Sequence, residues 1–547
     1  MAGLSEYCLN TFVSKYPKKI SKTIQYGTAG FRTTAEDLSH VMFRMGLLAT
    51  LRSRVTSAAI GVMITASHNP EPDNGVKLVD PHGEMLDPDW ELVATELANV
   101  PDDQVENSVK NIIDRFQIDM DKSASVFIGR DTRPSSKSLS EAVTAGVEVL
   151  QGVANDYGVV TTPMLHYFVT CHNTDGAYGR PTQEGYCDKL SIAFKALRGE
   201  TNMNGHYKPE LEFDGANGVG ALKMSELLRY LGDCLQVNIH NADTTTRGKL
   251  NYQCGADHVK SKQVPPSGVP LRRYARCASV DGDADRLVYY FVDDNSAFHL
   301  LDGDRIATLV AGYLKKLMEE SGLELKMGLV QTAYANGSST KYISESLNVP
   351  VACVPTGVKN LHKKALEFDI GVYFEANGHG TVVFSSDAKR QIKNATKDTS
   401  LPASQVAAAE RLAYMVDLTN ETVGDALSDL LLVETVMHAR GWDVTDWLRT
   451  YTDLPNRLMK VKVQDRNVIT TTDAERRCVT PEGLQDRIDL LVTKCPNGRS
   501  FVRPSGTEDI VRVFAEADTA DHADTLAVQV AQAVYELAGG VGPLPSL

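Results

Sequence analysis

The chain has 547 residues, enough for three or four domains of ordinary size. Hydrophobic residues make up 42% and charged residues 23%, which is typical of a globular protein with a large buried core. The net charge of −14 argues against a nucleic-acid backbone as partner, although local arginines and a metal can still hold a small phosphate compound. Because no run of about 18 apolar residues is present, we expect no membrane span.

The first 22 residues are polar and lack the apolar core of a secretion signal, so we expect a cytoplasmic protein. The nine cysteines are scattered and form no Cys-x-x-Cys pair. An odd number of cysteines in a chain of this size favours reduced thiols over a disulfide framework.

Short apolar runs that end in polar turns recur along the chain and alternate with helix-like stretches. The runs lie at residues 62–64, 211–213, 278–280 and 372–374, and helices are predicted at 138–151, 224–231 and 303–320. This alternation predicts α/β domains, in which ligands gather at the carboxyl ends of strands. A polar, lysine-rich segment at residues 385–405 is interpreted as a surface loop.

We expect domain boundaries near residue 190, near residue 300 and around residues 450–456. The last boundary rests on Asp-Leu-Pro-Asn at residues 453–456, which is interpreted as a linker. The predicted domains are residues 1–190, 191–299, 300–452 and 453–547.

Residues 65–70 read Thr-Ala-Ser-His-Asn-Pro and follow the apolar run 58–64, which is typical of a buried strand. Ser67 therefore stands where a core strand ends and a tight turn begins. A serine in this place can carry a covalent group, and the adjacent His68 can move a proton. The alternative is that Ser67 only satisfies local backbone groups.

Residues 281–286 read Asp-Gly-Asp-Ala-Asp-Arg. In extended backbone Asp281, Asp283 and Asp285 point the same way, and a divalent cation between them relieves their repulsion. An EF-hand is excluded, because the sixth position is arginine and the twelfth valine where that motif needs glycine and glutamate. Few carboxylates with open positions suit Mg²⁺, and the alternative is a solvated acidic turn.

Two further motifs suit a sugar phosphate. Residues 503–508 read Arg-Pro-Ser-Gly-Thr-Glu, so a guanidinium, two hydroxyls and a glycine N–H form a phosphate cradle, to which Arg512 can add. Residues 375–380 read Glu-Ala-Asn-Gly-His-Gly, whose Glu375 and Asn377 suit sugar hydroxyls. The alternatives are an ordinary turn at each place, with His379 as a structural histidine. Weaker candidates lie at residues 27–32 and 356–362.

A serine that can carry phosphate, a metal triad, a phosphate cradle and a sugar loop are the parts that phosphoryl transfer needs. The four motifs, in this order, resemble those of the α-D-phosphohexomutase superfamily, and the matches run over residues 27–512. Within it the chain resembles the phosphoacetylglucosamine mutase family, because hexose mutases usually carry a Gly-Glu-Met/Phe-Ser type of sugar loop. Residues 162–167 and 251–257 also resemble that branch.

The resemblance implies three related α/β domains and a smaller C-terminal α+β domain around a central cleft. It implies that N-acetylglucosamine 6-phosphate and 1-phosphate interconvert through a phosphoserine and a 1,6-bisphosphate, a step toward UDP-N-acetylglucosamine. It also implies one Mg²⁺ per active site, a catalytic sugar 1,6-bisphosphate as primer, sugar phosphates as partners, and a monomer or weak dimer.

Residue by residue, the resemblance assigns three groups of site residues. The catalytic candidates are Ser67, His68, Arg32 and Lys77, among which the general base stays open. The substrate-binding candidates are Glu375, Ala376, Asn377, Arg503, Pro504, Ser505, Gly506, Thr507 and Arg512. The metal candidates are Ser67, Asp281, Asp283 and Asp285.

Two other functions remain compatible with these motifs. One is a phosphoglucomutase or phosphomannomutase, against which the Glu-Ala-Asn-Gly-His-Gly loop argues. The other is a non-catalytic sugar-phosphate-binding protein, against which the intact Ser67, the three aspartates and Arg503 argue.

Overall fold

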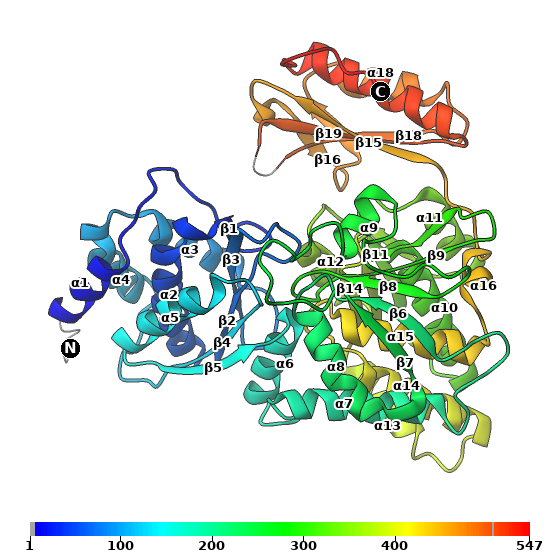
Figure 1. The fold of residues 1–547 in the computed structure, drawn as a ribbon, viewed down its shortest axis with the longest axis horizontal. Helices are drawn as coiled ribbons and strands as arrows, with labels where there is room; N and C mark the ends of the chain where they lie inside the picture. The colour runs from blue at the N-terminus through cyan, green and yellow to red at the C-terminus, as the bar shows by residue number, and fades with distance from the viewer. Residues whose placement is uncertain (1–5, 506–507) are drawn as a thin grey trace. The chain divides into compact units, whose positions relative to one another are not determined.

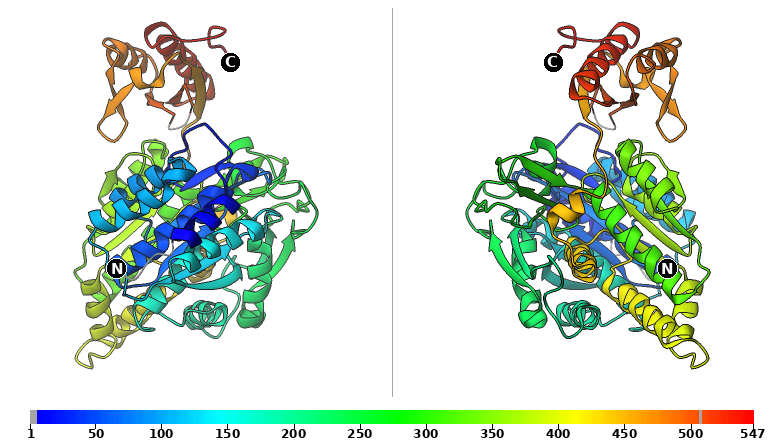
Figure 2. Two further views of the ribbon diagram at one scale, coloured as in Figure 1. Left: turned by 90° about the vertical axis from the view of Figure 1, so that its left-hand side faces the viewer. Right: turned by 90° about the vertical axis from the view of Figure 1, so that its right-hand side faces the viewer.

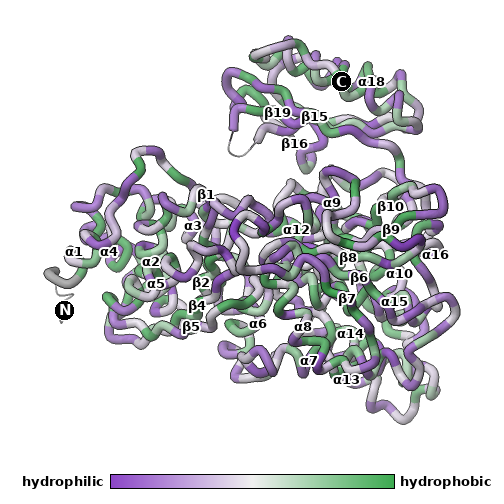
Figure 3. Tube along the Cα trace, viewed as in Figure 1, coloured by the Kyte–Doolittle hydropathy of each residue, from purple (hydrophilic) through white to green (hydrophobic). Residues whose placement is uncertain are grey.

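A computed structural model describes residues 6–505 and 508–547 of the chain. It contains two compact units. Unit 1 extends to Asp302 and also includes Asn377–Thr381 and Glu410–Val444, and unit 2 consists of Gly303–Ala376, Val382–Ala409 and Thr445–Leu547. Apolar residues concentrate on the strands and on the helices that cover them, and the connecting loops are mostly hydrophilic (Figure 3).

The first sheet of unit 1 is mixed, with two antiparallel junctions followed by two parallel ones. Its strands in spatial order are β1 (Phe31–Thr34), β3 (Asp73–Val79), β2 (Ile60–Ile64), β4 (Ser125–Arg130) and β5 (Val153–Val159). Helices α2 (Ser39–Thr56) and α5 (Ser136–Val149) lie against one side, and α6 (Thr162–Asn173) lies on the other (Figure 1). The N-terminal helices are completed by α1 (Glu6–Lys15), α3 (Pro88–Asn99) and α4 (Val105–Arg115).

Strand β2 is buried on both faces, which explains its continuous apolar sequence. Val62 and Ile64 belong to the core that α2 and α5 share. A β-carbon built on Gly61 would lie 3.0 Å from the side chain of Val169 on α6, so the alternate residues of the strand face that helix. The strand is thereby clamped between two helical layers, and the turn that follows it starts from a rigid position.

The second sheet of unit 1 repeats the same sequence of junctions. Its strands in spatial order are β10 (Phe298–Leu301), β9 (Leu287–Val292), β8 (Cys277–Val280), β6 (Glu210–Asp214) and β7 (Gln236–His240). The helices of this part are α7 (Gln183–Arg198), α8 (Val219–Leu231), α9 (Ala256–Lys262) and α15 (Ala426–Arg440). Strands β2 and β8 each lie between an antiparallel and a parallel neighbour, so the loops after them occupy equivalent places.

The first part of unit 2 holds a four-stranded sheet. Its order is β12 (Val351–Cys353), β11 (Met327–Gln331), β13 (Ile370–Phe374) and β14 (Gly380–Phe384). Its helices are α10 (Gly303–Ser321), α11 (Gly337–Lys341), α12 (Val358–Ala365) and α13 (Ser386–Ala395). Three elements, β14, α14 (Ala403–Leu418) and α16 (Val444–Leu448), contain residues of both units.

The C-terminal part of unit 2 is an antiparallel sheet with two helices. The sheet consists of β15 (Asn456–Lys462), β19 (Ile510–Glu516) and β18 (Arg499–Pro504), beside a hairpin of β16 (Thr470–Thr472) and β17 (Arg477–Thr480). Helices α17 (Leu484–Val492) and α18 (Ala520–Leu537) pack against each other and share one apolar core with the three-stranded sheet (Figures 1 and 2). Short helical turns elsewhere are η1 (Ala35–Asp37), η2 (Asp102–Gln104), η3 (Gly232–Cys234), η4 (Tyr342–Ser346) and η5 (Arg466–Val468).

The expected α/β fold class is confirmed, and the four apolar runs are β2, β6, β8 and β13. The loop predicted at residues 385–405 is wrong, because α13 occupies much of it. Ser385 caps that helix with its side chain, and Ala388, Ile392 and Ala395 bury one face at helical spacing under an otherwise charged sequence. The eight cysteines whose environment is described are free thiols. In the described part of the chain, no helix is long and apolar enough to cross a membrane.

The four-domain division stays a prediction. Its first boundary falls inside α7 and its second inside β10, whereas residues 451–455 before β15 have no regular structure.

Candidate active site

Ser67 sits directly after β2 with its side chain fully buried. Its backbone is left-handed, at φ 51°, a conformation that non-glycine residues rarely adopt. The Ser67 N–H donates to Thr65 Oγ1 at 2.9 Å, and that hydroxyl donates to Asp131 at 2.8 Å. The turn is therefore held by side chains from a neighbouring loop as well as by its own sequence.

The predicted serine loop and metal loop meet in unit 1. Ser67 Oγ donates to Asp281 Oδ2 at 2.6 Å. Asp281, Asp283 and Asp285 are each at most 3% exposed, and they offer carboxylate oxygens that all lie within 4.8 Å of one another. A serine hydroxyl and three carboxylates that could hold a metal ion are thus buried together.

Lys77 on β3 partly offsets the charge of this triad. Its ammonium lies 3.4 Å from Asp283 and 3.2 Å from Asp285. Burial, and repulsion from Asp285 and Asp283, raise the pKa of Asp281 well above its usual value. Burial also acts on Asp285, but Lys77 and His379 hold its pKa well below the usual value. Lys77 therefore leaves part of the repulsion among the three carboxylates unrelieved, and a bound cation would reduce it.

The residues fit a magnesium ion. The Oδ1 atoms of Asp283 and Asp285 are buried; that of Asp283 accepts no hydrogen bond from the described residues, and that of Asp285 faces His379 Nδ1 at 3.4 Å. Buried carboxylate oxygens of this kind need a cation or a donor, and Mg²⁺ prefers oxygen ligands. Thr162 at the start of α6 donates to the other oxygen of Asp283 at 2.6 Å, which fixes the orientation of that carboxylate.

His68 and Arg32 are both partly buried and lie close enough to interact electrostatically. The imidazole Nδ1 of His68 is 3.4 Å from Ser67 Oγ. Burial, followed by the charges of Arg286 and Arg32, lowers the pKa of His68 to about 2, so the ring is neutral and a weak base. Burial and Arg286 also lower the pKa of Arg32.

The predicted sugar loop joins the two units in sequence. Glu375 and Ala376 belong to unit 2, and the loop continues into unit 1 at Asn377. There Asn377 Oδ1 accepts the N–H of His379 at 3.0 Å, and His379 Nδ1 lies 3.4 Å from Asp285. The second half of the sugar loop is thus tied to the metal loop.

Gly378 has to be glycine at this point of the sugar loop. Its φ is +89°, and its carbonyl accepts the N–H of Leu287 at 3.1 Å. A β-carbon there would lie 1.9 Å from the Leu287 oxygen.

The predicted phosphate loop lies in unit 2. Arg503 and Arg512 are direct partners across β18 and β19, so both guanidinium groups start from one face of the sheet. Two arginines on one face favour a dianion such as a phosphate. Pro504 ends β18 and Ser505 follows it with 6% exposure, whereas Gly506 and Thr507 lie outside the described residues.

Glu475 connects the phosphate loop to the loop before α12. It stands between β16 and β17, in a run of three non-glycine residues with left-handed backbone. Its carboxylate accepts Arg503 Nε at 2.9 Å, and also accepts the N–H and hydroxyl of Thr356 at 2.9 and 2.5 Å. Tyr334 lies near Arg503 and Arg512, which partly offset the rise in its pKa that burial causes.

Sequence reasoning did not assign a role to Glu475 or Tyr334, and it noted residues 162 and 251 only for their resemblance. Glu475 is 28 residues from Arg503 and 119 residues from Thr356, so no local sequence pattern could predict these two contacts. For Thr162 and Asn251, the sequence signal was the resemblance of residues 162–167 and 251–257 to one branch of the superfamily.

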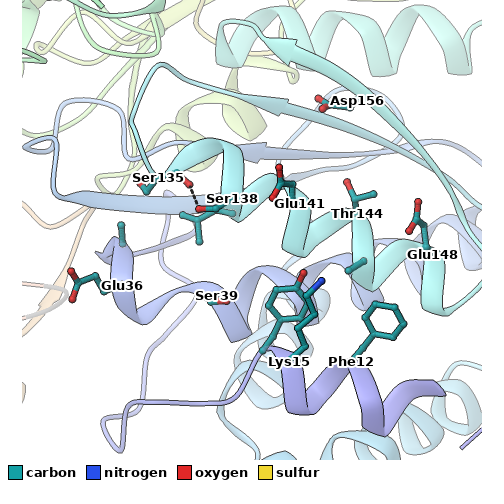
Figure 4. Close-up of a pocket in the computed structure, with 14 residues that line it drawn as sticks. Phe12, Lys15, Glu36, Ser39, Ser135, Ser138, Glu141, Thr144, Glu148 and Asp156 are labelled. Carbon is teal, nitrogen blue, oxygen red and sulfur yellow. Dashed lines mark hydrogen bonds between the residues drawn. The ribbon is translucent and has the colours of Figure 1, made fainter. Parts of the chain in front are cut away.

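A separate groove of about 790 Å³ lies between α1, the start of α2 and α5 (Figure 4). Phe12 and Tyr16 line it together with exposed carboxylates such as Glu141 and Glu148. None of the predicted site residues lines this groove. The groove is therefore separate from the candidate active site, which the contacts around Ser67 and the three aspartates define.

Comparison with known families matches four consecutive segments of the chain. Residues 38–103 and 98–178 match the phosphoglucomutase/phosphomannomutase alpha/beta/alpha domain I. Residues 182–288 and 302–442 match domains II and III of phosphoacetylglucosamine mutase AMG1. Residues 458–533 match the phosphoglucomutase/phosphomannomutase C-terminal domain.

Full-length relatives are similar throughout. The phosphoacetylglucosamine mutase of Homo sapiens is 55% identical over 522 residues, covering 95% of this chain and 96% of the relative. That of Saccharomyces cerevisiae is 44% identical, with 91% and 93% covered. The Aspergillus fumigatus N-acetylphosphoglucosamine mutase, solved in complex with GlcNAc-6P and magnesium, has a TM-score of 0.94 at 47% identity, with 98% and 100% covered.

Four consecutive domain matches, with a buried serine beside three aspartates, are the features of an α-D-phosphohexomutase. Both central segments match domains of one branch, and identity to its members extends over nearly the whole length. The chain belongs to the phosphoacetylglucosamine mutase family.

Proposed function

We propose that this protein is a phosphoacetylglucosamine mutase that interconverts N-acetylglucosamine 6-phosphate and N-acetylglucosamine 1-phosphate. The reaction runs through a phosphoserine and a sugar 1,6-bisphosphate. A serine-to-alanine variant of the Aspergillus fumigatus relative was solved with glucose 1,6-bisphosphate, which agrees with such an intermediate. The observation that carries the proposal is the 2.6 Å contact between buried Ser67 and Asp281 within the three-aspartate cluster.

Ser67 carries the phosphoryl group in the resting enzyme. The sugar O1 hydroxyl attacks the phosphorus, so that the O1–P bond forms, the P–Oγ bond breaks and the hydroxyl proton passes to a base. Reorientation of the bisphosphate then lets Ser67 Oγ attack the 6-phosphate, which regenerates the phosphoserine and releases the 1-phosphate. In this second step the O6–P bond breaks, and O6 takes the proton back to become a hydroxyl.

The buried charges around Ser67 set the electrostatics of both half-reactions. Lys77, at 3.2 Å from Asp285, and Arg32 supply positive charge near the transferred group. The role of general base stays open among His68, Lys77 and Arg32, with the low pKa of His68 arguing against a strongly basic imidazole.

Asp281, Asp283 and Asp285 would hold Mg²⁺ together with the phosphorylated Ser67. When bound, the ion withdraws charge from the phosphoryl oxygens. Thr162 and Lys77 keep the carboxylates of Asp283 and Asp285 oriented for that role.

We assign the phosphate that is not being transferred to Arg503, Ser505, Gly506, Thr507 and Arg512, with Pro504 shaping the turn. The facing positions of Arg503 and Arg512 support this role. Glu375, Ala376 and Asn377 are assigned to the sugar ring, whose hydroxyls match their acceptors and donors.

The remaining expectations complete the proposal. We expect a cytoplasmic monomer or weak dimer that uses a sugar 1,6-bisphosphate as primer and binds neither nucleic acid nor membranes. The net charge of −14 supports the expectation on nucleic acid.

The test is ³¹P NMR of the protein with N-acetylglucosamine 6-phosphate, Mg²⁺ and catalytic glucose 1,6-bisphosphate. Parallel tubes hold glucose and mannose 6-phosphates, and a 1-phosphate signal that grows fastest from the acetylated sugar is expected. Faster conversion of glucose 6-phosphate or mannose 6-phosphate would refute the proposed substrate. No conversion in any tube would favour a non-catalytic sugar-phosphate-binding protein. Ser67→Ala should abolish turnover. Ser57→Ala is its matched control, because Ser57 is exposed and also has left-handed backbone.

A further inference from the structure

Asn251 lies in the connection between β7 and α9 and reaches across to the serine loop. Its side-chain Nδ2 donates to the carbonyl oxygen of Ser67 at 2.9 Å and to that of Asn69 at 3.1 Å. Both carbonyls belong to the turn that presents Ser67 Oγ, which the Asn69 N–H closes on Ala66 O at 3.0 Å. The bonds span more than 180 residues of sequence and connect the second sheet's connecting loop to the first sheet's active loop.

A second donor addresses the same two oxygens. Arg133, in the loop between β4 and α5, donates through Nη2 to Ser67 O at 3.0 Å and to Asn69 O at 2.9 Å. Each carbonyl therefore accepts two hydrogen bonds. A left-handed serine costs about 1–2 kcal/mol relative to ordinary backbone, and it persists only where the surroundings hold it.

Asn251 is itself rigidly placed against the metal loop. Its N–H donates to Ala216 O at 3.0 Å. A β-carbon on Gly282, inside the metal loop, would lie 2.7 Å from Ser67 O and 3.0 Å from Asn251 Nδ2. The amide thus packs where the backbone of the serine loop meets that of the metal loop, and only glycine at residue 282 leaves room for both.

We propose that Asn251 is a positioning residue that holds Ser67 in its left-handed conformation at a fixed distance from Asp281. The side-chain amide of Asn251 donates to backbone carbonyls of the serine loop, so it acts on the transferred phosphoryl group through Ser67 and leaves sugar binding to other residues. This inference rests on the proposed mutase function. It predicts that loss of the amide lowers kcat and leaves KM nearly unchanged.

Two substitutions separate positioning from packing. Asn251→Ala removes the donor and lowers kcat about 10–100-fold, because misplacement by about 1 Å costs a reaction about 10²-fold. Asn251→Asp keeps the size and the tolerance for left-handed backbone, but turns a carboxylate oxygen toward two carbonyl oxygens. Positioning predicts that the aspartate variant is at least as impaired as the alanine variant, whereas simple packing predicts that it is nearly normal.

Gln253→Ala is the matched control. Gln253 lies on the same connection and is exposed, and its backbone is left-handed like that of Asn251, with φ 53° compared with 58°. Its kcat is expected within twofold of the unmodified protein. All variants are assayed as ³¹P turnover of N-acetylglucosamine 6-phosphate, with circular dichroism as the check on folding and intact mass as the measure of serine phosphorylation.

The outcomes distinguish this inference from the proposed function. If the unmodified protein shows no mutase turnover, the proposed function fails first. If the unmodified protein is active and a folded Asn251→Asp variant keeps its kcat, or changes KM alone, Asn251 is not a positioning residue. If Asn251→Ala fails to fold, the aspartate variant decides by the same criterion, and loss of folding in both would overturn the inference in favour of a purely structural role.

Discussion

Gly378 in the sugar loop offers a quantitative test of the site geometry. In Gly378→Ala, the added methyl would lie 1.9 Å from the Leu287 carbonyl oxygen, whereas ordinary contacts begin at 3.4 Å. The loop or strand β9 therefore has to move by about 1.5 Å, the difference between those distances. Overpacking costs about 1–3 kcal/mol and the left-handed alanine about 1–2 kcal/mol, so we expect a loss of about 2–5 kcal/mol in unfolding free energy.

The same displacement should affect catalysis. His379 follows directly in sequence and lies 3.4 Å from Asp285, so a shift of the loop moves both the residues proposed to bind the sugar and a neighbour of the metal loop. We expect kcat/KM to fall about 100-fold, since misplacement by about 1 Å costs that much. The assays are urea unfolding followed by circular dichroism, and initial rates with N-acetylglucosamine 6-phosphate.

Gly158→Ala is the control that isolates backbone strain from steric contact. Its φ is +71°, and a β-carbon there meets nothing within 4 Å. It should lose only about 1–2 kcal/mol and keep its kcat/KM within about threefold. Equal stability and equal activity in the two alanine variants would refute the reasoning, because the clash at Gly378 would then have no consequence.

Three further predictions follow from other parts of the structure. Asp283→Asn removes one charge of the triad and should raise the Mg²⁺ concentration for half-maximal rate at least tenfold, and an unchanged titration would exclude Asp283 as a ligand. Glu475→Ala frees Arg503 and Thr356 from their shared carboxylate and should change KM for the sugar phosphate at least threefold with kcat within twofold; an unchanged KM would separate this contact from substrate binding. Burial and nearby cations lower the pKa of His40 to about 4. The unfolded chain therefore binds the extra proton between about pH 6.5 and 4, and the unfolding free energy falls as the pH drops through that window. His40→Gln should reduce the loss between pH 7.5 and 5 by up to about 2 kcal/mol in urea titrations, and parallel pH profiles would contradict it.

The local parts of the site were predictable because each is contiguous in sequence. An apolar run followed by a serine and Asn-Pro, or by three alternating aspartates, predicts a strand end with functional side chains, and both occur where expected after β2 and β8. Their meeting was not predictable from local pattern, since Ser67 and Asp281 are 214 residues apart. Only the resemblance to a known family placed them in one site.

Other features escaped the sequence for physical reasons. Helix α13 has a charged composition, and its three small or apolar buried positions are spread over two turns, so polarity concealed the helical spacing. Asn251 and Glu475 act through contacts to distant backbone and side-chain atoms, and a single asparagine or glutamate has no local signature of such a role.

Phosphoryl transfer to Ser67 tests the central claim most directly. The protein is incubated with Mg²⁺ and glucose 1,6-bisphosphate, and intact mass and peptide sequencing locate any phosphoryl group gained. The account predicts one phosphoryl group on Ser67, transferable to N-acetylglucosamine 6-phosphate, and none in Ser67→Ala. A stable phosphoryl group on another residue, or mutase turnover that survives Ser67→Ala, would contradict it.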